Sequence, residues 1–350
     1  MNVVILNDTR ADMHHGCSRV MRLLEEGLER HGLTISARSP VRHDWQSDAT
    51  LRTAIAGASL IVINGEGTLH HGSRHAARLL AVTDVAGDTP VALVNALYQD
   101  NPPEWAKWLH KLSYIATRDS RSAAEIARLT GKTPTVIPDL SMSERITKNS
   151  EPSTLVFGDS VEADVTTHLA DLARGQGMPL VPSVSVLKRS KGRTAIGRAL
   201  RNLWIKRHLR RAKVANPTLD ICTTEGAYAS RIAAASLYVT GRFHGVCYAL
   251  AAGTPFVAVK SNSWKIEALV ADAGLAPWRV MALDNLDKCL ARGPDHLAFD
   301  PAERAALARF LDGATAGAEK MFADLGTLAA GHSKRSNDKV NGTVLAESGR

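Results

Sequence analysis

The residues best suited to chemistry lie within residues 237–253, where an apolar run ends at Gly241 and is followed by Arg242 and His244. An apolar run, a glycine and a second apolar run are typical of a strand that turns into a helix. The N–H groups at a helix start, a guanidinium and an imidazole together suit a phosphate or a carboxylate. Histidine also exchanges a proton near neutral pH. We predict that Arg242 and Gly245 contact a phosphate or a carboxylate and that His244 exchanges a proton there.

Two further cations are candidates for the same anion. Lys265 follows the next predicted strand and a polar turn, so it should emerge at the same sheet edge as Arg242 and His244. An ammonium there can hold a phosphate oxygen. Arg118 follows a predicted strand at residues 114–116 and precedes a predicted helix. Each residue also has a purely structural interpretation. Arg242 would pair with a surface acid, His244 would cap the helix or pack against it, and Lys265 would be exposed to solvent.

A glycine-rich loop, residues 64–72, follows the predicted strand at residues 60–63 and holds three glycines and two histidines. Glycines allow the backbone to approach a ligand closely. The loop does not read GxGxxG, so it does not indicate a dinucleotide site. We predict that Glu66 is a base or a contact to sugar hydroxyls. Its neighbours Asn64, Gly67 and His70 are assigned to the same acceptor side.

The amino-terminal loop, residues 8–16, ends in His14, His15 and Gly16 and is followed by Cys17. A catalytic Cys17 is one interpretation, but unpaired cysteines are more often small buried residues. The histidine pairs at residues 14–15 and 70–71 match no standard zinc spacing, so we expect no metal. The cysteines form no CxxC pair, which argues against a disulfide framework and a structural zinc site. They are Cys17, Cys222, Cys247 and Cys289.

Alternating strands and helices must position these residues. Strands are predicted at residues 2–6, 33–37, 60–63, 91–94, 114–116 and 135–137, then at 154–157, 180–184, 219–222, 237–239 and 256–259. Strand–helix alternation indicates mostly parallel sheets, with ligands at the carboxyl ends of the strands. We predict an α/β protein with two Rossmann-like domains facing a cleft. The acceptor-side domain spans residues 1–145 and the donor-side domain residues 152–330, and the polar tail, residues 331–350, is predicted to be disordered.

The chain has 350 residues, of which 45% are hydrophobic and 22% charged, as in a globular protein. Its net charge of +8 is concentrated in residues 187–213, which contain eleven Lys or Arg and no Asp or Glu. Basic residues alternating with Leu and Trp suit an anionic membrane surface. The alternatives are an insertion exposed to solvent, or a segment that binds an anionic polysaccharide. Nucleic-acid binding is disfavoured, because the segment has few aromatic side chains to stack on bases. The predicted contacts are Arg201, Trp204, Arg207, Arg210 and Arg211.

The apolar runs are too short for a membrane-spanning helix or a signal-peptide core. We therefore expect a cytoplasmic protein that associates peripherally with the inner face of the plasma membrane. The sequence gives no expectation for the oligomeric state.

The sequence resembles the polysaccharide pyruvyl transferase family. The resemblance rests first on residues 241–245, Gly-Arg-Phe-His-Gly, with Gly253-Thr254-Pro255 behind them. Further matching residues are Lys265, Arg118-Asp119-Ser120, Pro138-Asp139, the loop at residues 65–69, and Gly16. Gly16 is predicted to contact the acceptor together with residues of that loop. The resemblance implies a fold like that of GT-B glycosyltransferases. It also implies transfer of a pyruvyl group from phosphoenolpyruvate to hydroxyls of a surface polysaccharide or its lipid-linked precursor, forming a ketal.

By this resemblance Arg118, Arg242, His244 and Lys265 map to donor-binding and catalytic positions. His244 is then the general acid, and Gly245 lies at the donor. No cofactor is expected beyond phosphoenolpyruvate as co-substrate. The chemistry agrees with the residue types, since a donor with a phosphate and a carboxylate requires several cations. Two alternatives stay open. One is a GT-B-type glycosyltransferase that uses an activated sugar donor, and the other is a catalytically silent binding subunit held at membranes by residues 187–213.

Overall fold

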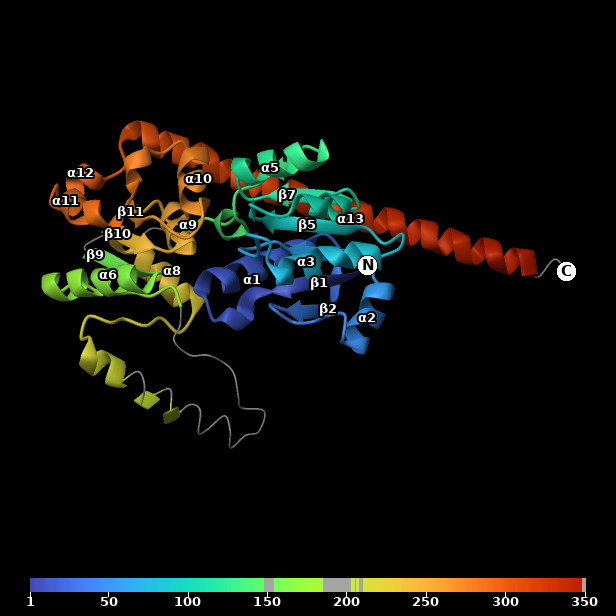
Figure 1. The fold of residues 1–350 in the computed structure, drawn as a ribbon, viewed down its shortest axis with the longest axis horizontal. Coiled ribbons are helices and arrows are strands. Elements are labelled where there is room, and N and C mark those ends of the chain that lie inside the picture. Colours follow the sequence, from blue (N-terminus) through green and yellow to red (C-terminus); the bar gives the residue numbers. More distant parts are fainter. Residues whose placement is uncertain (148–153, 185–202, 205, 208–209, 348–350) are drawn as a thin grey trace. The chain divides into compact units, whose positions relative to one another are not determined.

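The computed structural model describes residues 1–147, 154–184, 203–204, 206–207 and 210–347 (Figure 1). These residues form two compact units, each assembled from separate segments of the chain. Unit 1 contains Met1–Thr9, Met21–Leu140 and the described chain from residue 314 onward. Unit 2 contains Arg10–Val20 and the described chain from residue 141 to residue 313. The predicted domains, residues 1–145 and 152–330, are continuous segments, whereas each unit combines separate segments.

Unit 1 is built on a six-stranded parallel sheet in the order β2-β1-β3-β5-β7-β8. Every residue of β3 and β5 is buried, as expected for central parallel strands covered on both faces. The strands are β1 (Asn2–Asp8), β2 (Thr34–Pro40), β3 (Leu60–Asn64), β5 (Val91–Ala96), β7 (Tyr114–Thr117) and β8 (Thr135–Val136). A separate parallel pair, β4 (Leu69–His70) with β6 (Tyr98–Gln99), was not predicted because each strand has two residues.

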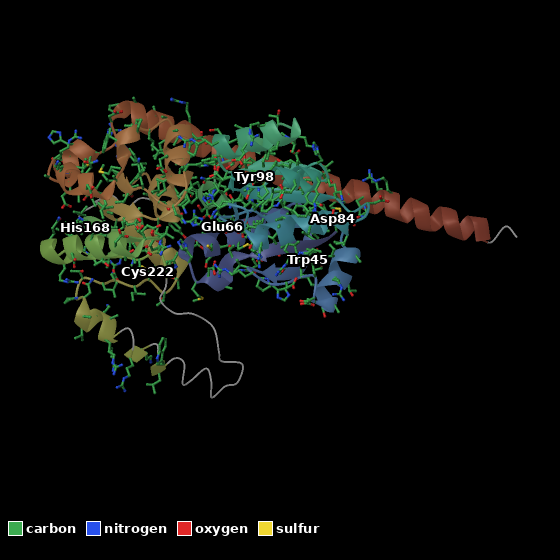
Figure 2. The ribbon with its side chains drawn as sticks, viewed as in Figure 1. Trp45, Glu66, Asp84, Tyr98, His168 and Cys222 are labelled. Carbon is green, nitrogen blue, oxygen red and sulfur yellow. The ribbon has the colours of Figure 1, made fainter. Side chains whose placement is uncertain are left out.

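The helices of unit 1 begin at polar caps. Asp48, Ser73 and Asp119 accept hydrogen bonds from backbone N–H groups in the first turns of α2, α3 and α5. Together with most of α1 (His15–Arg30), the helices are α2 (Ala49–Ala56), α3 (Arg74–Leu80), α4 (Ala106–Leu109) and α5 (Ser120–Thr130). The core between these helices and the sheet includes Trp45, Tyr98 and Trp105 (Figure 2 labels Trp45 and Tyr98).

Unit 2 is built on a four-stranded parallel sheet in the order β12-β11-β10-β9. The strands are β9 (Thr154–Ser160), β10 (Ala235–Gly241), β11 (Phe256–Val259) and β12 (Val280–Met281). The strands predicted at residues 180–184 and 219–222 are wrong in extent. Within the described chain, Leu180 forms isolated parallel bridges to Phe157 of β9 and to Leu219, and Val184 forms an antiparallel bridge to His14. Pro179 and Pro182 flank Leu180, and proline cannot donate to a sheet ladder.

The helices of unit 2 include one that is buried on every face. All nine residues of α9 (Phe243–Ala251) are buried, because this helix packs within the body of the unit. The others are α6 (Ala163–Gln176), α8 (Glu225–Ala233), α10 (Lys265–Asp272), α11 (Leu286–Leu290), α12 (Pro294–Leu297) and the first turns of α13 (Pro301–Glu347). The structure continues α13 through residues 331–347, where the composition predicted disorder. Extending an existing helix avoids the cost of nucleating a new one.

Candidate functional site

The junction between β10 and α9 places two predicted site residues next to each other. Arg242 is the residue that precedes the first turn of α9, and His244 is the second residue of that helix. The His244 side chain is buried, with 8% of the residue exposed. A Cβ at Gly245 would lie 2.9 Å from Oγ1 of Thr240, so glycine lets the helix start pack closely against β10. The predicted strand–turn–helix junction is therefore confirmed.

Asp159, at the carboxyl end of β9, fixes the guanidinium of Arg242. Its Oδ2 accepts a hydrogen bond from Arg242 Nε at 2.9 Å. Its Oδ1 accepts from the N–H and the hydroxyl of Ser183 at 2.8 and 2.7 Å. Asp159 is only 6% exposed, so the acid that pairs with Arg242 is buried and not a surface group. Sequence reasoning missed Asp159, although its position at a strand's carboxyl end was an available signal.

The amino-terminal segment Arg10–Val20 belongs to unit 2 and adds residues to this site. The N–H of His15 donates to the carbonyl of Ser183 at 3.0 Å, and the hydroxyl of Tyr248 donates to the carbonyl of His15 at 3.0 Å. These bonds hold the start of α1 against the site. The rings of His14 and His244 consequently lie 5.1 Å apart between centroids.

Gly16 is the point of closest approach between this segment and His244. A Cβ at position 16 would lie 2.1 Å from Cγ of His244, far inside van der Waals contact. Gly16 was assigned to the acceptor side from the sequence, yet the structure places it in unit 2 beside the proposed acid. A glycine is therefore required here because only a residue without a side chain leaves room for the imidazole.

Positive charge gathers around His14. Burial holds the pKa of His14 well below its usual value, and His244, Arg242, His15 and Lys265 lower that pKa further. His14 is therefore neutral at neutral pH, while Arg242 and Lys265 carry positive charge. Nζ of Lys265 donates to Oδ1 of Asn262 at 3.1 Å. A site with two fixed cations at the start of a buried helix is suited to an anion.

The predicted residues Arg242, His244 and Lys265 are thus brought together within one unit. Burial also lowers the pKa of the His15 imidazole, while a hydrogen bond to the Cys222 backbone partly restores it. Sγ of Cys17 and one ring nitrogen each of His14 and His244 lie within 4.8 Å of one another. His14, His15 and Cys17 were noted in the sequence but assigned no role at this site.

The acceptor-side candidates lie in unit 1 at the carboxyl ends of β1 and β3. Glu66, labelled in Figure 2, is 4% exposed and accepts from the Thr9 hydroxyl at 2.6 Å. It also accepts from the Asn64 side-chain amide at 3.3 Å. Gly67 is exposed and has a φ of 58°, which favours glycine, and His70 is half-buried on β4. Buried hydrogen bonds from Thr9 and Asn64 therefore fix Glu66 within unit 1. Its role as a base or as a contact to an acceptor stays a prediction.

Arg118 lies in unit 1 and is buried, 3.5 Å from Oδ2 of Asp139. The next residue, Asp119, caps α5 by accepting from the Ser122 N–H at 2.8 Å, as the sequence predicted. The buried pair at Arg118 puts a cation at the carboxyl end of β7. Its convergence with Arg242 and Lys265 remains a prediction.

The basic segment is described only in part. Arg201 lies outside the described residues. Trp204 is 58% exposed, and Arg207, Arg210 and Arg211 are exposed. Across the described chain, no helix combines the length and the apolar character needed to cross a bilayer.

Comparison with known proteins agrees with this architecture. An α-glucosyltransferase solved with UDP and a 13-mer DNA superposes with a TM-score of 0.54 at 10% identity, over 93% of this chain and 99% of that chain. UDP-GlcNAc 2-epimerase from Neisseria meningitidis gives a TM-score of 0.52 at 10% identity, with the same coverage. These likenesses concern the fold and confirm the predicted α/β, GT-B-like class. No curated protein matches the chain.

The family comparison covers most of both units. The sequence profile described as polysaccharide pyruvyl transferase matches residues 22–263. This range includes the loop of Glu66, the pair at Arg118, and the junction that carries Arg242 and His244. The chain therefore belongs to the polysaccharide pyruvyl transferase family.

Proposed function

We propose that this transferase moves a pyruvyl group from phosphoenolpyruvate to two hydroxyls of a polysaccharide, or of its lipid-linked precursor, and forms a cyclic ketal. The observation that carries the proposal is the grouping of Arg242, His244 and Lys265 around the neutral His14. Phosphoenolpyruvate carries a phosphate and a carboxylate, and both require cationic partners. The family membership supports a pyruvyl donor over other anions.

The proposed chemistry uses the residues of unit 2 as follows. Arg242 and Lys265 bind the donor anion, and Asp159 holds the Arg242 guanidinium in place. His244 gives a proton to the methylene carbon, which becomes a methyl group and leaves positive character on the adjacent carbon. One sugar hydroxyl adds to that carbon and loses its proton. Phosphate then departs with its bonding electrons, and a second hydroxyl adds and loses its proton to close the ketal.

Donor binding is tested by thermal unfolding of the full chain with phosphoenolpyruvate. A ligand that binds the native state raises the melting temperature, so phosphoenolpyruvate should raise it and a panel of sugar nucleotides should not. Arg242→Ala should abolish the shift. Arg231→Ala is the matched control, because Arg231 also pairs through Nε with an aspartate of unit 2, Asp220, at 2.8 Å. Normal phosphoenolpyruvate binding by Arg242→Ala would remove Arg242 from the donor site.

The acid role of His244 is tested with His244→Gln, which keeps the size of the side chain but removes the titratable proton donor. General acid–base groups contribute about a hundred- to ten-thousand-fold. Turnover should fall by at least about a hundredfold, while the phosphoenolpyruvate-dependent shift in melting temperature is largely kept. Turnover close to that of the unmodified chain would exclude His244 as the acid.

The main alternative is transfer of a sugar from a nucleotide donor on the same fold. Two fold neighbours were solved with UDP or UDP-GlcNAc, which is why this alternative is tested directly. Mass spectrometry of the host's surface glycan, with and without this protein, separates the two. A lost pyruvate ketal supports the proposal, whereas a lost sugar residue supports the alternative.

A further inference from the structure

Three potential metal ligands from two separate segments of unit 2 lie together. They are His14, Cys17 and His244, and one ligand atom from each lies within 4.8 Å of the others. Cys17 lies in the first turn of α1, and His14 is the residue immediately before that helix. His244 lies in the first turn of α9. The cluster is therefore held by the starts of two helices, which limits how far its members can move apart.

The ligand types favour a zinc-like ion. Two imidazoles and a thiolate are typical ligands of Zn²⁺. Zinc bond lengths imply ligand atoms about 3.3–3.8 Å apart, so atoms that lie as far as 4.8 Å apart must approach by up to about 1.5 Å to hold an ion. Rotation of the half-buried His14 and Cys17 side chains can supply that contraction. Three protein ligands leave the fourth tetrahedral position open.

The protonation state of His14 suits a ligand. Nδ1 of His14 accepts a hydrogen bond from the Gly16 N–H at 3.1 Å, so this nitrogen carries a lone pair that an ion can take over. Only an imidazole with a free lone pair binds metal, and the hydrogen bond from Gly16 marks such a lone pair on Nδ1. Arg242 and Lys265 oppose a bound cation. The thiolate of Cys17 offsets part of that repulsion, and the start of α1 stabilises its negative charge.

We propose that unit 2 binds one Zn²⁺-like ion through His14, Cys17 and His244, and that the bound ion suppresses the transferase activity. The ion occupies the nitrogen lone pair that His244 needs to carry a proton, so the metal-bound chain lacks its acid. The suppression rests on the function proposed above, whereas the metal site itself does not. The ion is therefore an inhibitor of the reaction and not a cofactor for it.

Metal binding is tested with Co²⁺ as a spectroscopic probe on the full chain after removal of metals with EDTA. Co²⁺ should produce a thiolate charge-transfer band and the intense visible bands of four-coordinate cobalt, and Zn²⁺ should remove both. Cys17→Ser should lose the charge-transfer band and weaken Zn²⁺ binding at least about tenfold. Cys289→Ser is the matched control, because Cys289 lies in the apolar core of unit 2.

A variant of a second proposed ligand, His14, tests the metal site without changing Cys17. His14→Ala should also weaken Zn²⁺ binding at least about tenfold, while His168→Ala, at an exposed pair with Asp287, should not. Circular dichroism checks that each variant is folded. A cobalt spectrum without a thiolate band, or one that survives Cys17→Ser, overturns the metal site.

The activity arm uses phosphoenolpyruvate turnover by the EDTA-treated chain. Zn²⁺ should inhibit it, and Cys17→Ser should raise the half-inhibitory Zn²⁺ concentration at least about tenfold. If the chain is active and binds Co²⁺ through Cys17 but Zn²⁺ does not inhibit, the suppression is overturned. If the EDTA-treated chain consumes no phosphoenolpyruvate, the proposed function fails, and the cobalt spectrum still decides the metal site.

Discussion

Asp159 holds Arg242 through a single charged hydrogen bond, and that bond can be removed without changing the shape of either side chain. Asp159→Asn keeps the volume and an oxygen for Ser183 but loses the negative charge. Removing one partner of a largely buried charged pair leaves the other without compensation, so we expect the free energy of unfolding to fall by about 1–3 kcal/mol. The KM for phosphoenolpyruvate should rise, because the guanidinium is no longer oriented. Urea unfolding and steady-state kinetics measure the two effects.

The matched control for this prediction is Asp220→Asn. Asp220 pairs with Nε of Arg231 at 2.8 Å, but the Arg231 side chain is 59% exposed. Exposed ion pairs contribute about 0–1 kcal/mol. Equal losses of stability in the two variants would show that Asp159 is no more than another surface partner.

The lowered pKa of His14 leads us to expect that unit 2 is less stable in mild acid. The pKa of His14 is held well below its usual value in the folded chain, mainly by burial. In the unfolded chain an ordinary histidine takes up a proton below about pH 6.5. Between that pH and the lower folded pKa, the unfolded chain binds more protons, so the free energy of unfolding falls as the pH falls. The loss is at most about 1.4 kcal/mol per pH unit for one imidazole.

Urea unfolding at pH 7.5 and pH 5.5, in EDTA, measures this loss. His14→Gln should reduce it, because glutamine does not titrate, and His15 accounts for a further part since burial also lowers its pKa. Thr167→Ala, on the exposed face of α6, is a control without a titratable group. An unchanged pH dependence in His14→Gln would contradict the burial of His14 in the folded state.

At the scale of elements, the start of α1 and the start of α9 meet at Gly16. Gly16→Ala would place a Cβ 2.1 Å from Cγ and 2.4 Å from Cβ of His244, and that Cβ cannot move without shifting the helix that carries it. Such overpacking costs about 1–3 kcal/mol. We expect Gly16→Ala to lower the melting temperature and to reduce turnover by displacing His244. Differential scanning calorimetry and a turnover assay measure both.

Gly175→Ala is the control for that substitution. Gly175 lies inside α6, and a Cβ there would meet no atom within 4 Å. Alanine is a better helix former than glycine by about 0.5–1 kcal/mol, so this variant should be slightly more stable. If both glycine variants behave alike, the close approach of Gly16 to His244 is not what limits position 16.

Local sequence patterns predicted some of these strands and missed others. Buried apolar runs such as β3 and β5 lie where they were predicted, because central parallel strands have no polar face to interrupt the run. Short pairings such as β12 were missed, since two residues carry no periodicity. The overestimated strand near Leu180 had an apolar pattern, but flanking prolines limit its hydrogen bonding.

At the scale of the whole molecule, the charge of the basic segment predicts association with anionic membranes. Trp204 is 58% exposed and Leu203 is 66% exposed, so apolar groups accompany the cations. Each cation near an anionic surface contributes about 1 kcal/mol, and salt screens the attraction over about 8–10 Å. The chain should sediment with anionic liposomes at low salt and be released at high salt. Trp204→Ala should reduce the bound fraction.

Replacing Arg207, Arg210 and Arg211 together with Gln should release the chain while activity on a short soluble acceptor survives. Neutral liposomes are the control for the charge dependence. Equal sedimentation with neutral and anionic liposomes would refute the electrostatic account. Loss of activity on the soluble acceptor would instead assign these arginines to binding an anionic glycan.

The alternation of strands and helices, the α/β class and the family could all be predicted from the sequence, because they depend on local periodicity and on the contiguous residues Gly241 to Gly245. The sequence also placed Arg242 and His244 at one strand–turn–helix junction, which the structure confirms. These features need no knowledge of which segments meet.

The residues that surround this junction could not be predicted from the sequence, because they come from distant parts of the chain. Asp159 reaches Arg242 across 83 positions, and the start of α1 reaches Tyr248 across 233. No local pattern encodes contacts at such separations, which depend on how strands pair and helices pack. Arg10–Val20 belongs to unit 2 because of the same long-range contacts. These contacts place His14, Gly16 and Cys17 next to His244, which their positions in the sequence do not indicate.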